Sequence, residues 1–134
     1  MLIKISAYII LCLALFGCSE PPYTNIDNAQ LISMMKQGVA VYDIRRIDEW
    51  MQTGIIENSQ RLTFVSANGR LLPNFMPKFT QSVDKNQPVI LICRTGNRSA
   101  VLARHLMQEM KYTQVYNVRN GITHWISDGN PVVR

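Results

Sequence analysis

The sequence has no run of like charges, no low-complexity tract and no internal repeat, and it holds only two histidines and three cysteines. Its 14 Lys and Arg residues outnumber 9 Asp and Glu residues, giving a formal charge of +5, but the cations are scattered along the chain. Because a nucleic-acid interface needs clustered cations, we predict no nucleic-acid partner. Neither His105 nor His124 has metal-ligand spacing with Cys93, so we predict no metal and no other cofactor.

No apolar run is long enough to span a bilayer comfortably as a helix. The N-terminal run covers residues 7–16 behind one cation, Lys4, and is typical of a signal peptide. It leads into Leu-Phe-Gly-Cys at residues 15–18, which resembles the lipobox of bacterial lipoproteins, in which the cysteine becomes diacylated. Two alternatives are an ordinary Cys18 behind a conventional signal and an uncleaved anchor.

The lipobox resemblance implies an exported form of the protein. We expect residues 1–17 to be a lipoprotein signal peptide, and residues 18–25 to be the lipidated cysteine and a polar tether. The acyl chains on Cys18 would hold the protein on a membrane of the cell envelope, facing the periplasm or the extracellular side.

This export route leaves Cys93 as the free thiol of the mature chain. Cys12 leaves with the signal peptide and Cys18 carries lipid, so Cys93 has no intramolecular disulfide partner. A lone thiol in an oxidising compartment is prone to oxidation. Its presence therefore indicates either burial or chemistry.

Residues 26–134 predict a single domain in which helices and strands alternate. The expected helices cover residues 27–36, 48–52, 74–83, 99–110 and 121–126, and the expected strands cover residues 39–44, 61–62, 88–92 and 114–118. This order predicts an α/β fold with a central parallel sheet and helices on both faces. Asp43 and Cys93 fall at the carboxyl ends of strands, where the chemistry of such sheets collects.

The loop after the 88–92 strand carries the strongest chemical signal. It comprises Cys93, Arg94, Thr95, Gly96, Asn97 and Arg98, and Ser99 then opens a helix. A short loop entering a helix can turn its backbone N–H groups inward and stabilise an anion, and Gly96 permits the tight curl. Arg94 and Arg98 add positive charge, so we expect Cys93 to be a reactive thiolate.

Residues 93–99 are similar to the active-site loop of the rhodanese family, Cys-Arg-x-Gly-x-Arg-Ser. Residues 41–50 resemble the family's first signature, and residues 116–132 resemble its closing segment. The chain thus resembles a single-domain rhodanese, or thiosulfate sulfurtransferase-like protein. Two segments depart from the pattern: Ile55 stands where the family usually has histidine, and residues 63–77 match poorly and have no functional interpretation.

The resemblance implies sulfur transfer through a persulfide on Cys93. The sulfur would come from a small anionic donor such as thiosulfate or polysulfide, and a thiol or cyanide would accept it. The loop residues Arg94, Thr95, Gly96, Asn97, Arg98 and Ser99 would bind substrate and persulfide. Three further residues would support the loop, namely Asp43, Arg45 and Glu49.

Two other functions stay open. One is a sulfur carrier that hands sulfur to a membrane partner and turns over small donors poorly. The other is a cysteine phosphatase or arsenate reductase, which also places a cysteine and an arginine around an anion. Phosphatases need five residues between these two, whereas four separate Cys93 from Arg98, which favours binding of a single sulfur.

Overall fold

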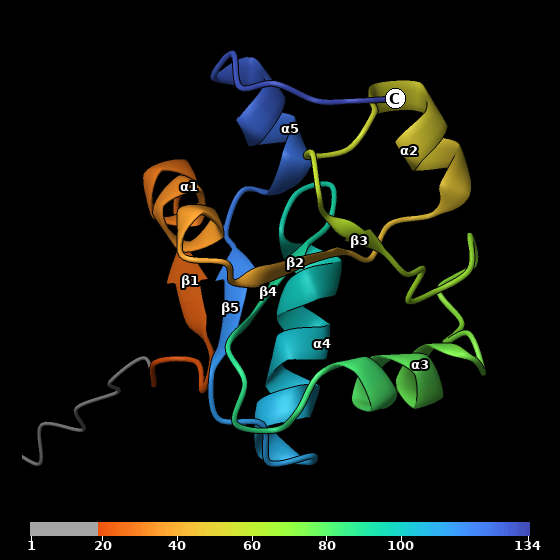
Figure 1. Cartoon of the computed structure of the whole chain (residues 1–134). Helices are drawn as coiled ribbons and strands as arrows, with labels where there is room; N and C mark the ends of the chain where they lie inside the picture. Colours follow the sequence, from red (N-terminus) through yellow and green to blue (C-terminus); the bar gives the residue numbers. More distant parts are fainter. Residues whose placement is uncertain (1–18) are drawn as a thin grey trace, which may run out of the picture.

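The computed structural model describes residues 19–134, so the predicted signal peptide and the lipidated Cys18 lie outside the described residues. Within that range, five strands form one parallel sheet of order β1-β5-β4-β2-β3. The strands are β1 (Thr24–Ile26), β2 (Ala40–Asp43), β3 (Gln60–Arg61), β4 (Val89–Ile92) and β5 (Val115–Val118). The helices are α1 (Asn28–Lys36), α2 (Ile47–Thr53), α3 (Phe75–Ser82), α4 (Asn97–Gln108) and α5 (Gly121–Ser127) (Figure 1).

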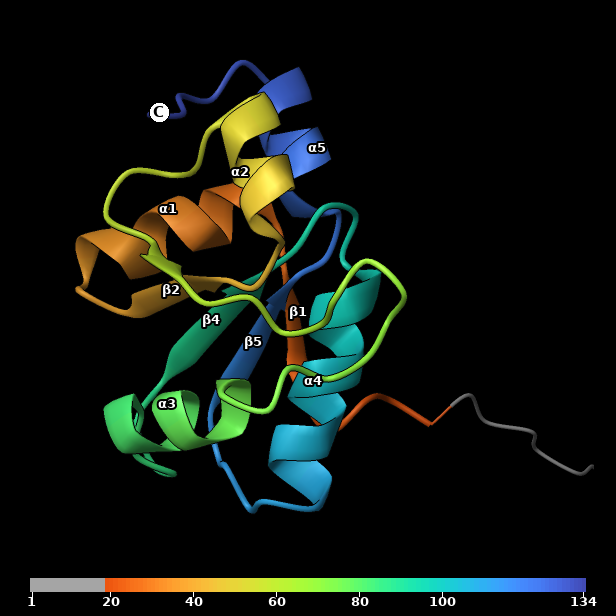
Figure 2. The ribbon, with the colours of Figure 1, turned by 90° about the vertical axis from the view of Figure 1, so that its right-hand side faces the viewer.

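The central strand β4 is buried on both faces, as its unbroken apolar run predicts. Successive side chains of a strand point to opposite faces. Val89 and Leu91 therefore pack in one core cluster with residues of α3 and α4, and Ile90 and Ile92 pack in another with residues of α1 and α5. Figure 2 shows these two helix pairs on opposite sides of the sheet. The predicted α/β architecture with helices on both faces is confirmed.

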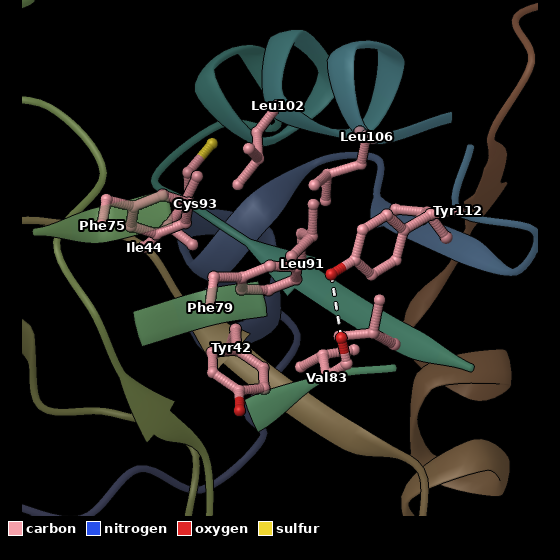
Figure 3. Packing of buried hydrophobic residues seen from close by; sticks show 13 residues of the cluster. Tyr42, Ile44, Phe75, Phe79, Val83, Leu91, Cys93, Leu102, Leu106 and Tyr112 are labelled. Carbon is pink, nitrogen blue, oxygen red and sulfur yellow. Dashed lines mark hydrogen bonds between the residues drawn. The ribbon is translucent and has the colours of Figure 1, made fainter. Parts of the chain in front are cut away.

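Aromatic side chains fill the core between the sheet and α3 (Figure 3). The rings of Phe75 and Phe79 stack with centroids 5.6 Å apart, and Tyr42 meets Phe79 edge-on at 5.2 Å. The Tyr112 hydroxyl donates to the Val83 carbonyl at 2.8 Å, so its polar end is satisfied. Each buried phenylalanine contributes roughly 2 to 3 kcal/mol. Cys93 belongs to the same cluster, so the packing of this core holds the residue that begins the predicted active-site loop.

The domain begins earlier than the sequence pattern indicates, which corrects the expected tether over residues 18–25. Thr24 and Asn25 lie in β1, where they pair with Tyr116 and Asn117 of β5. The strand is three residues long and only Ile26 is buried, so it shows no alternating pattern that sequence reading could detect. Because β1 is parallel to the other strands, residues 19–23 join the sheet at the end opposite Cys93 (Figure 1).

None of the helices in residues 19–134 is both long enough and apolar enough to cross a membrane.

Candidate active site

The sulfur of Cys93 lies in a ring of hydrogen-bond donors at the carboxyl end of β4. Its Sγ accepts from the backbone N–H of Gly96 at 3.1 Å, from the hydroxyl of Ser99 at 3.2 Å and from the backbone N–H of Ser99 at 3.5 Å. Cys93 is 1% exposed and is the free cysteine among the described residues. Donors that converge on one atom stabilise negative charge there, so the loop fits an anionic sulfur.

Gly96 makes this geometry possible. Its backbone adopts φ +94°, in the left-handed region, immediately before the first residue of α4. A Cβ at this position would overlap the carbonyl group of Arg119. Both the backbone conformation and the close approach therefore require glycine, as the sequence pattern predicts.

The start of α5 holds the opposite side of the loop. The N–H groups of Ile122 and Thr123 donate to the carbonyls of Cys93 and Arg94, at 2.9 and 3.1 Å. Gly121 has φ +64°, and a Cβ there would overlap the Arg94 carbonyl. These contacts satisfy the carbonyls of Cys93 and Arg94 and fix the start of the loop against α5.

Asn117 on β5 is a further loop contact that the sequence analysis did not assign to the site. It is 2% exposed, and its Nδ2 donates to the Gly96 carbonyl at 3.3 Å and to Asn25 Oδ1 at 3.0 Å. Its Oδ1 has no partner among the described residues. The sequence signals Asn117 only as a polar residue within an otherwise apolar strand. It signals Gly121 only by the position of a glycine shortly after that strand.

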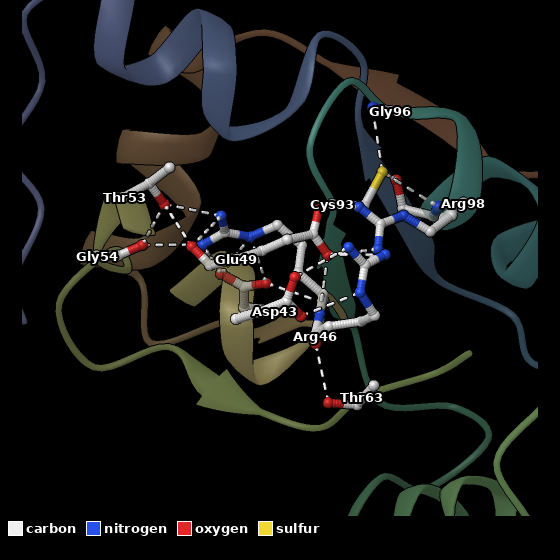
Figure 4. A network of polar contacts seen from close by, with 12 residues as sticks. Asp43, Arg46, Glu49, Thr53, Gly54, Thr63, Cys93, Gly96 and Arg98 are labelled. Carbon is white, nitrogen blue, oxygen red and sulfur yellow. Dashed lines mark hydrogen bonds and ion pairs between the residues drawn. The ribbon is translucent and has the colours of Figure 1, made fainter. Parts of the chain in front are cut away.

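Arg98 points to α2 and forms a bidentate ion pair with Glu49 (Figure 4). The two nitrogen–oxygen distances are 2.6 and 2.7 Å. Glu49 also accepts from the backbone N–H of Arg46 at 3.0 Å. The predicted ligand Arg98 and the predicted support Glu49 are thus brought together, although they lie 49 positions apart in the sequence.

This contact keeps both groups charged. Burial raises the pKa of Glu49, but hydrogen bonds from Arg98 and from the Arg46 N–H, together with the charges of both arginines, lower it more, to about 2 from an ordinary 4.5. The hydrogen bond to Glu49 in turn raises the pKa of Arg98. The pair is therefore ionised at neutral pH and ties α2 to the Cys93 loop.

Asp43 and Arg45 form a second ion pair, which is fully buried between β2 and the C-terminal end of α2. Two nitrogens of the Arg45 side chain contact the Asp43 carboxylate at 2.8 to 3.1 Å. The guanidinium also donates to the Thr53 hydroxyl at 2.8 Å and to the Gly54 carbonyl at 2.9 Å. These bonds join the end of β2 to the end of α2. Within the described chain, the Asp43 side chain makes no hydrogen bond to the Cys93 loop. Asp43 is connected to that loop through its pairing with Ile92, the residue before Cys93, and through the Arg45 bonds to α2.

The remaining predicted ligands lie at the rim of the loop. The side chains of Arg94, Thr95 and Asn97 are exposed, and none forms a hydrogen bond to another described residue. They are therefore available to contact a molecule that approaches Cys93. Residues 19–134 contain no group of three or more His, Cys, Asp or Glu side chains placed to hold a metal ion.

Comparisons with known proteins identify the family of the domain. The family model for the rhodanese-like domain matches residues 27–128. A sulfurtransferase from Allochromatium vinosum is 31% identical over 97 residues, which cover 72% of this chain and 80% of that protein.

Two solved structures illustrate the fold similarity. A rhodanese-related protein from Thermoplasma volcanium is 26% identical with a TM-score of 0.62, and the match covers 83% of this chain and 98% of that one. A protein of unknown function from Rhodopseudomonas palustris, described as a possible tyrosine phosphatase, is 25% identical with a TM-score of 0.63, over 83% and 85% of the two chains.

Proposed function

Because the chain belongs to the rhodanese-like domain family, with a sulfurtransferase among its relatives, we propose that it transfers sulfane sulfur through a persulfide on Cys93. The observation that carries the proposal is the set of three donors that converge on Cys93 Sγ. Each charge-assisted hydrogen bond to an anion contributes roughly 1.5 to 3 kcal/mol. The same donors would stabilise both the thiolate and the persulfide anion that replaces it.

The proposed reaction has two displacement steps. The Cys93 thiolate attacks the outer sulfur of thiosulfate, a bond to Sγ forms, and the original S–S bond breaks as sulfite leaves with the electron pair. A thiolate or cyanide then attacks the terminal sulfur of the persulfide, and the electron pair of that bond returns to Cys93. Arg94, Thr95 and Asn97, which are free at the rim, would contact the anionic donor.

The geometry favours sulfur over a phosphoryl group at this loop. Four residues separate Cys93 from Arg98, and the Arg98 guanidinium is held by Glu49 on both of its terminal nitrogens. A phosphatase arginine must instead face the phosphoryl oxygens.

Intact-mass spectrometry of the protein beginning at Ser19 tests the proposal. Thiosulfate treatment should add one sulfur atom, cyanide should remove it, and Cys93→Ala should not gain it. Rapid cyanide-dependent turnover would identify an enzyme, whereas stable loading with little turnover would identify a sulfur carrier. No sulfur gain, together with Cys93-dependent hydrolysis of a phosphatase substrate, would replace the proposal with a phosphatase.

We also propose that the full chain is a lipoprotein of the cell envelope, anchored through Cys18. Its support is the lipobox-like sequence and the position of residues 19–23, which enter the sheet at the end opposite Cys93. An anchor there would leave the site facing away from the membrane. In a bacterial host, a labelled palmitate analogue should be incorporated into the full chain and the Cys12→Ala variant but not into Cys18→Ala. Equal labelling of both variants would rule out this anchor.

A further inference from the structure

Exposed apolar side chains cluster on α2 beside the candidate site. Ile47 is 64% exposed and Met51, one helical turn later, is 74% exposed. Val133 is 40% exposed, and its backbone pairs with that of Ile55, two residues after the end of α2. We call this region the α2 surface. The described residues leave these apolar side chains largely exposed, and the proposed chemistry does not use them.

Two grooves adjoin the α2 surface and share Trp50 in their lining. Ile47, Trp50 and Arg61 line both grooves. The first groove is also lined by Met51 and Val133. The second groove is also lined by Leu72 and Lys78. The second groove thus includes part of residues 63–77, the segment for which the sequence has no functional interpretation.

The grooves carry positive charge without a balancing acidic side chain. Arg61 lines both grooves and Lys78 lines one, no Asp or Glu side chain lines either, and neither cation forms an ion pair with a side chain of the described chain. Arg61 lies over the Trp50 ring, 5.9 Å from its centroid. Apolar grooves lined by unpaired cations complement a segment that is both apolar and acidic.

The α2 surface is also connected to the Cys93 loop. Glu49, adjacent to Trp50, holds Arg98 of the loop. Phe75 lines the second groove and packs in the same core cluster as Cys93. Figures 1 and 4 show α2 at the end of the sheet that carries the loop. A chain bound on this surface would therefore lie at the end of the sheet that carries Cys93.

We propose that the α2 surface docks an acidic protein segment with apolar side chains, and that this segment brings the cysteine thiol that accepts sulfur from Cys93. This inference rests on the proposed sulfurtransferase function and names its acceptor class. The acceptor thiolate attacks the terminal sulfur of the persulfide, becomes a persulfide itself and leaves the thiolate on Cys93. A second copy of the chain is disfavoured because two cation-lined surfaces would repel each other.

Two synthetic peptides with one cysteine each serve as probes. One carries Asp, Glu, Leu and Phe, and its counterpart has Lys at every acidic position. The acidic peptide should shift the indole N–H signal of Trp50, whose Nε1 has no partner among the described residues. The indole of Trp125 is a built-in control, because Trp125 lines neither groove and its Nε1 already donates to the Pro131 carbonyl at 2.8 Å. Equal shifts of both indoles, or no shift, would contradict docking at α2.

Sulfur transfer provides the second readout. From the persulfide-loaded protein, transfer should be about 10-fold faster to the acidic peptide than to the basic one, because charge complementarity mainly raises association rates. The double variant Arg61→Glu/Lys78→Glu should lose this preference while its transfer to cyanide is unchanged. The matched control Lys85→Glu/Lys111→Glu changes the net charge equally at the opposite end of the sheet and should keep the preference.

The outcomes separate this inference from the proposed function. If Cys93 loads and cyanide turnover proceeds but the two peptides react at equal rates, the docking surface is wrong and sulfur transfer stands. If Cys93 never gains sulfur, the proposed function fails, and the Trp50 signal still tests docking. Binding to phosphatidylglycerol vesicles, or self-association in sedimentation, that is lost in Arg61→Glu/Lys78→Glu would replace the acidic segment with a lipid surface or a second copy.

Discussion

At the residue scale, the reactivity expected of Cys93 comes from the groups around its sulfur. The thiol ends a buried strand and is almost inaccessible, a position that by itself suits a packed core residue. Two backbone N–H groups and one hydroxyl point at this sulfur, and donors in that arrangement would stabilise an anionic sulfur. Of these donors only the Ser99 hydroxyl belongs to a side chain, so its contribution can be tested by substitution.

Ser99→Ala should slow persulfide formation from thiosulfate by about 10-fold to 100-fold, which corresponds to loss of one charge-assisted hydrogen bond. The variant should fold normally because Ser99 is fully buried in α4 and alanine is smaller and favours helix. Single-turnover loading followed by intact mass measures the rate. Ser127→Ala, which removes a hydroxyl bonded to the His124 carbonyl, is the control, and equal loading rates for the two variants would exclude a role for the Ser99 hydroxyl.

At the scale of elements, two contacts from helices position the Cys93 loop, in addition to the Asn117 side chain of β5. The Glu49–Arg98 ion pair joins the loop to α2, and backbone N–H groups in the first turn of α5 donate to two of the loop carbonyls. Both contacts are made by elements that lie far from the loop in the sequence. Each can be removed by one substitution that leaves the loop sequence intact.

Glu49→Gln should destabilise the protein at neutral pH, because it removes the carboxylate that compensates Arg98. The folded state lowers the pKa of Glu49 from 4.5 to about 2, so its stabilising effect is fully present above pH 4.5 and is lost as the pH falls toward 2. The difference in unfolding free energy between wild type and Glu49→Gln should therefore be largest above pH 5 and shrink toward pH 2. Urea unfolding across this range measures it.

The exposed Glu57 provides the matched control for that series. Glu57→Gln should follow the wild-type stability at each pH. A Glu49→Gln difference that stays constant from pH 7 to pH 2 would show that the lost stability does not come from the charge of the carboxylate.

Gly121→Ala should disturb the loop more than its backbone conformation alone explains. Gly121 and Gly129 both have positive φ, +64° and +81°, but a Cβ would overlap the Arg94 carbonyl only at Gly121 and would meet nothing within 4 Å at Gly129. Gly129→Ala should cost about 1 kcal/mol from backbone strain, and Gly121→Ala at least about 2 kcal/mol more. Urea midpoints measure both, and equal costs would show that the α5 contact is not tight.

At the scale of the whole molecule, the sheet needs its edge strand β1. Ile26 is 3% exposed and β1 pairs with β5 along its length. A protein beginning at Asp27 should therefore lose about 3 kcal/mol of unfolding free energy, from burial of Ile26 and from edge pairing. A protein beginning at Tyr23 should match one beginning at Ser19 within about 0.5 kcal/mol. Equal stability of all three would show that the domain does not depend on β1.

The sequence by itself determined the parts of this protein that depend on neighbouring residues. An unbroken apolar run produces β4, since a strand covered on both faces needs no polar side chain. The Cys93 loop and the start of α4 follow from one short segment, although the helix begins at Asn97, two residues before the predicted start. The parallel sheet follows from the alternation of elements.

Only the tertiary structure decided which distant residues meet. The sheet order places β1 beside β5, so three residues with no pattern of their own become a strand. The same order brings Glu49 to Arg98 and Gly121 to Arg94, and it buries the Asp43–Arg45 pair. The physical reason is that hydrophobic periodicity specifies a local conformation and the face it buries, whereas contacts between elements depend on how the whole sheet is assembled.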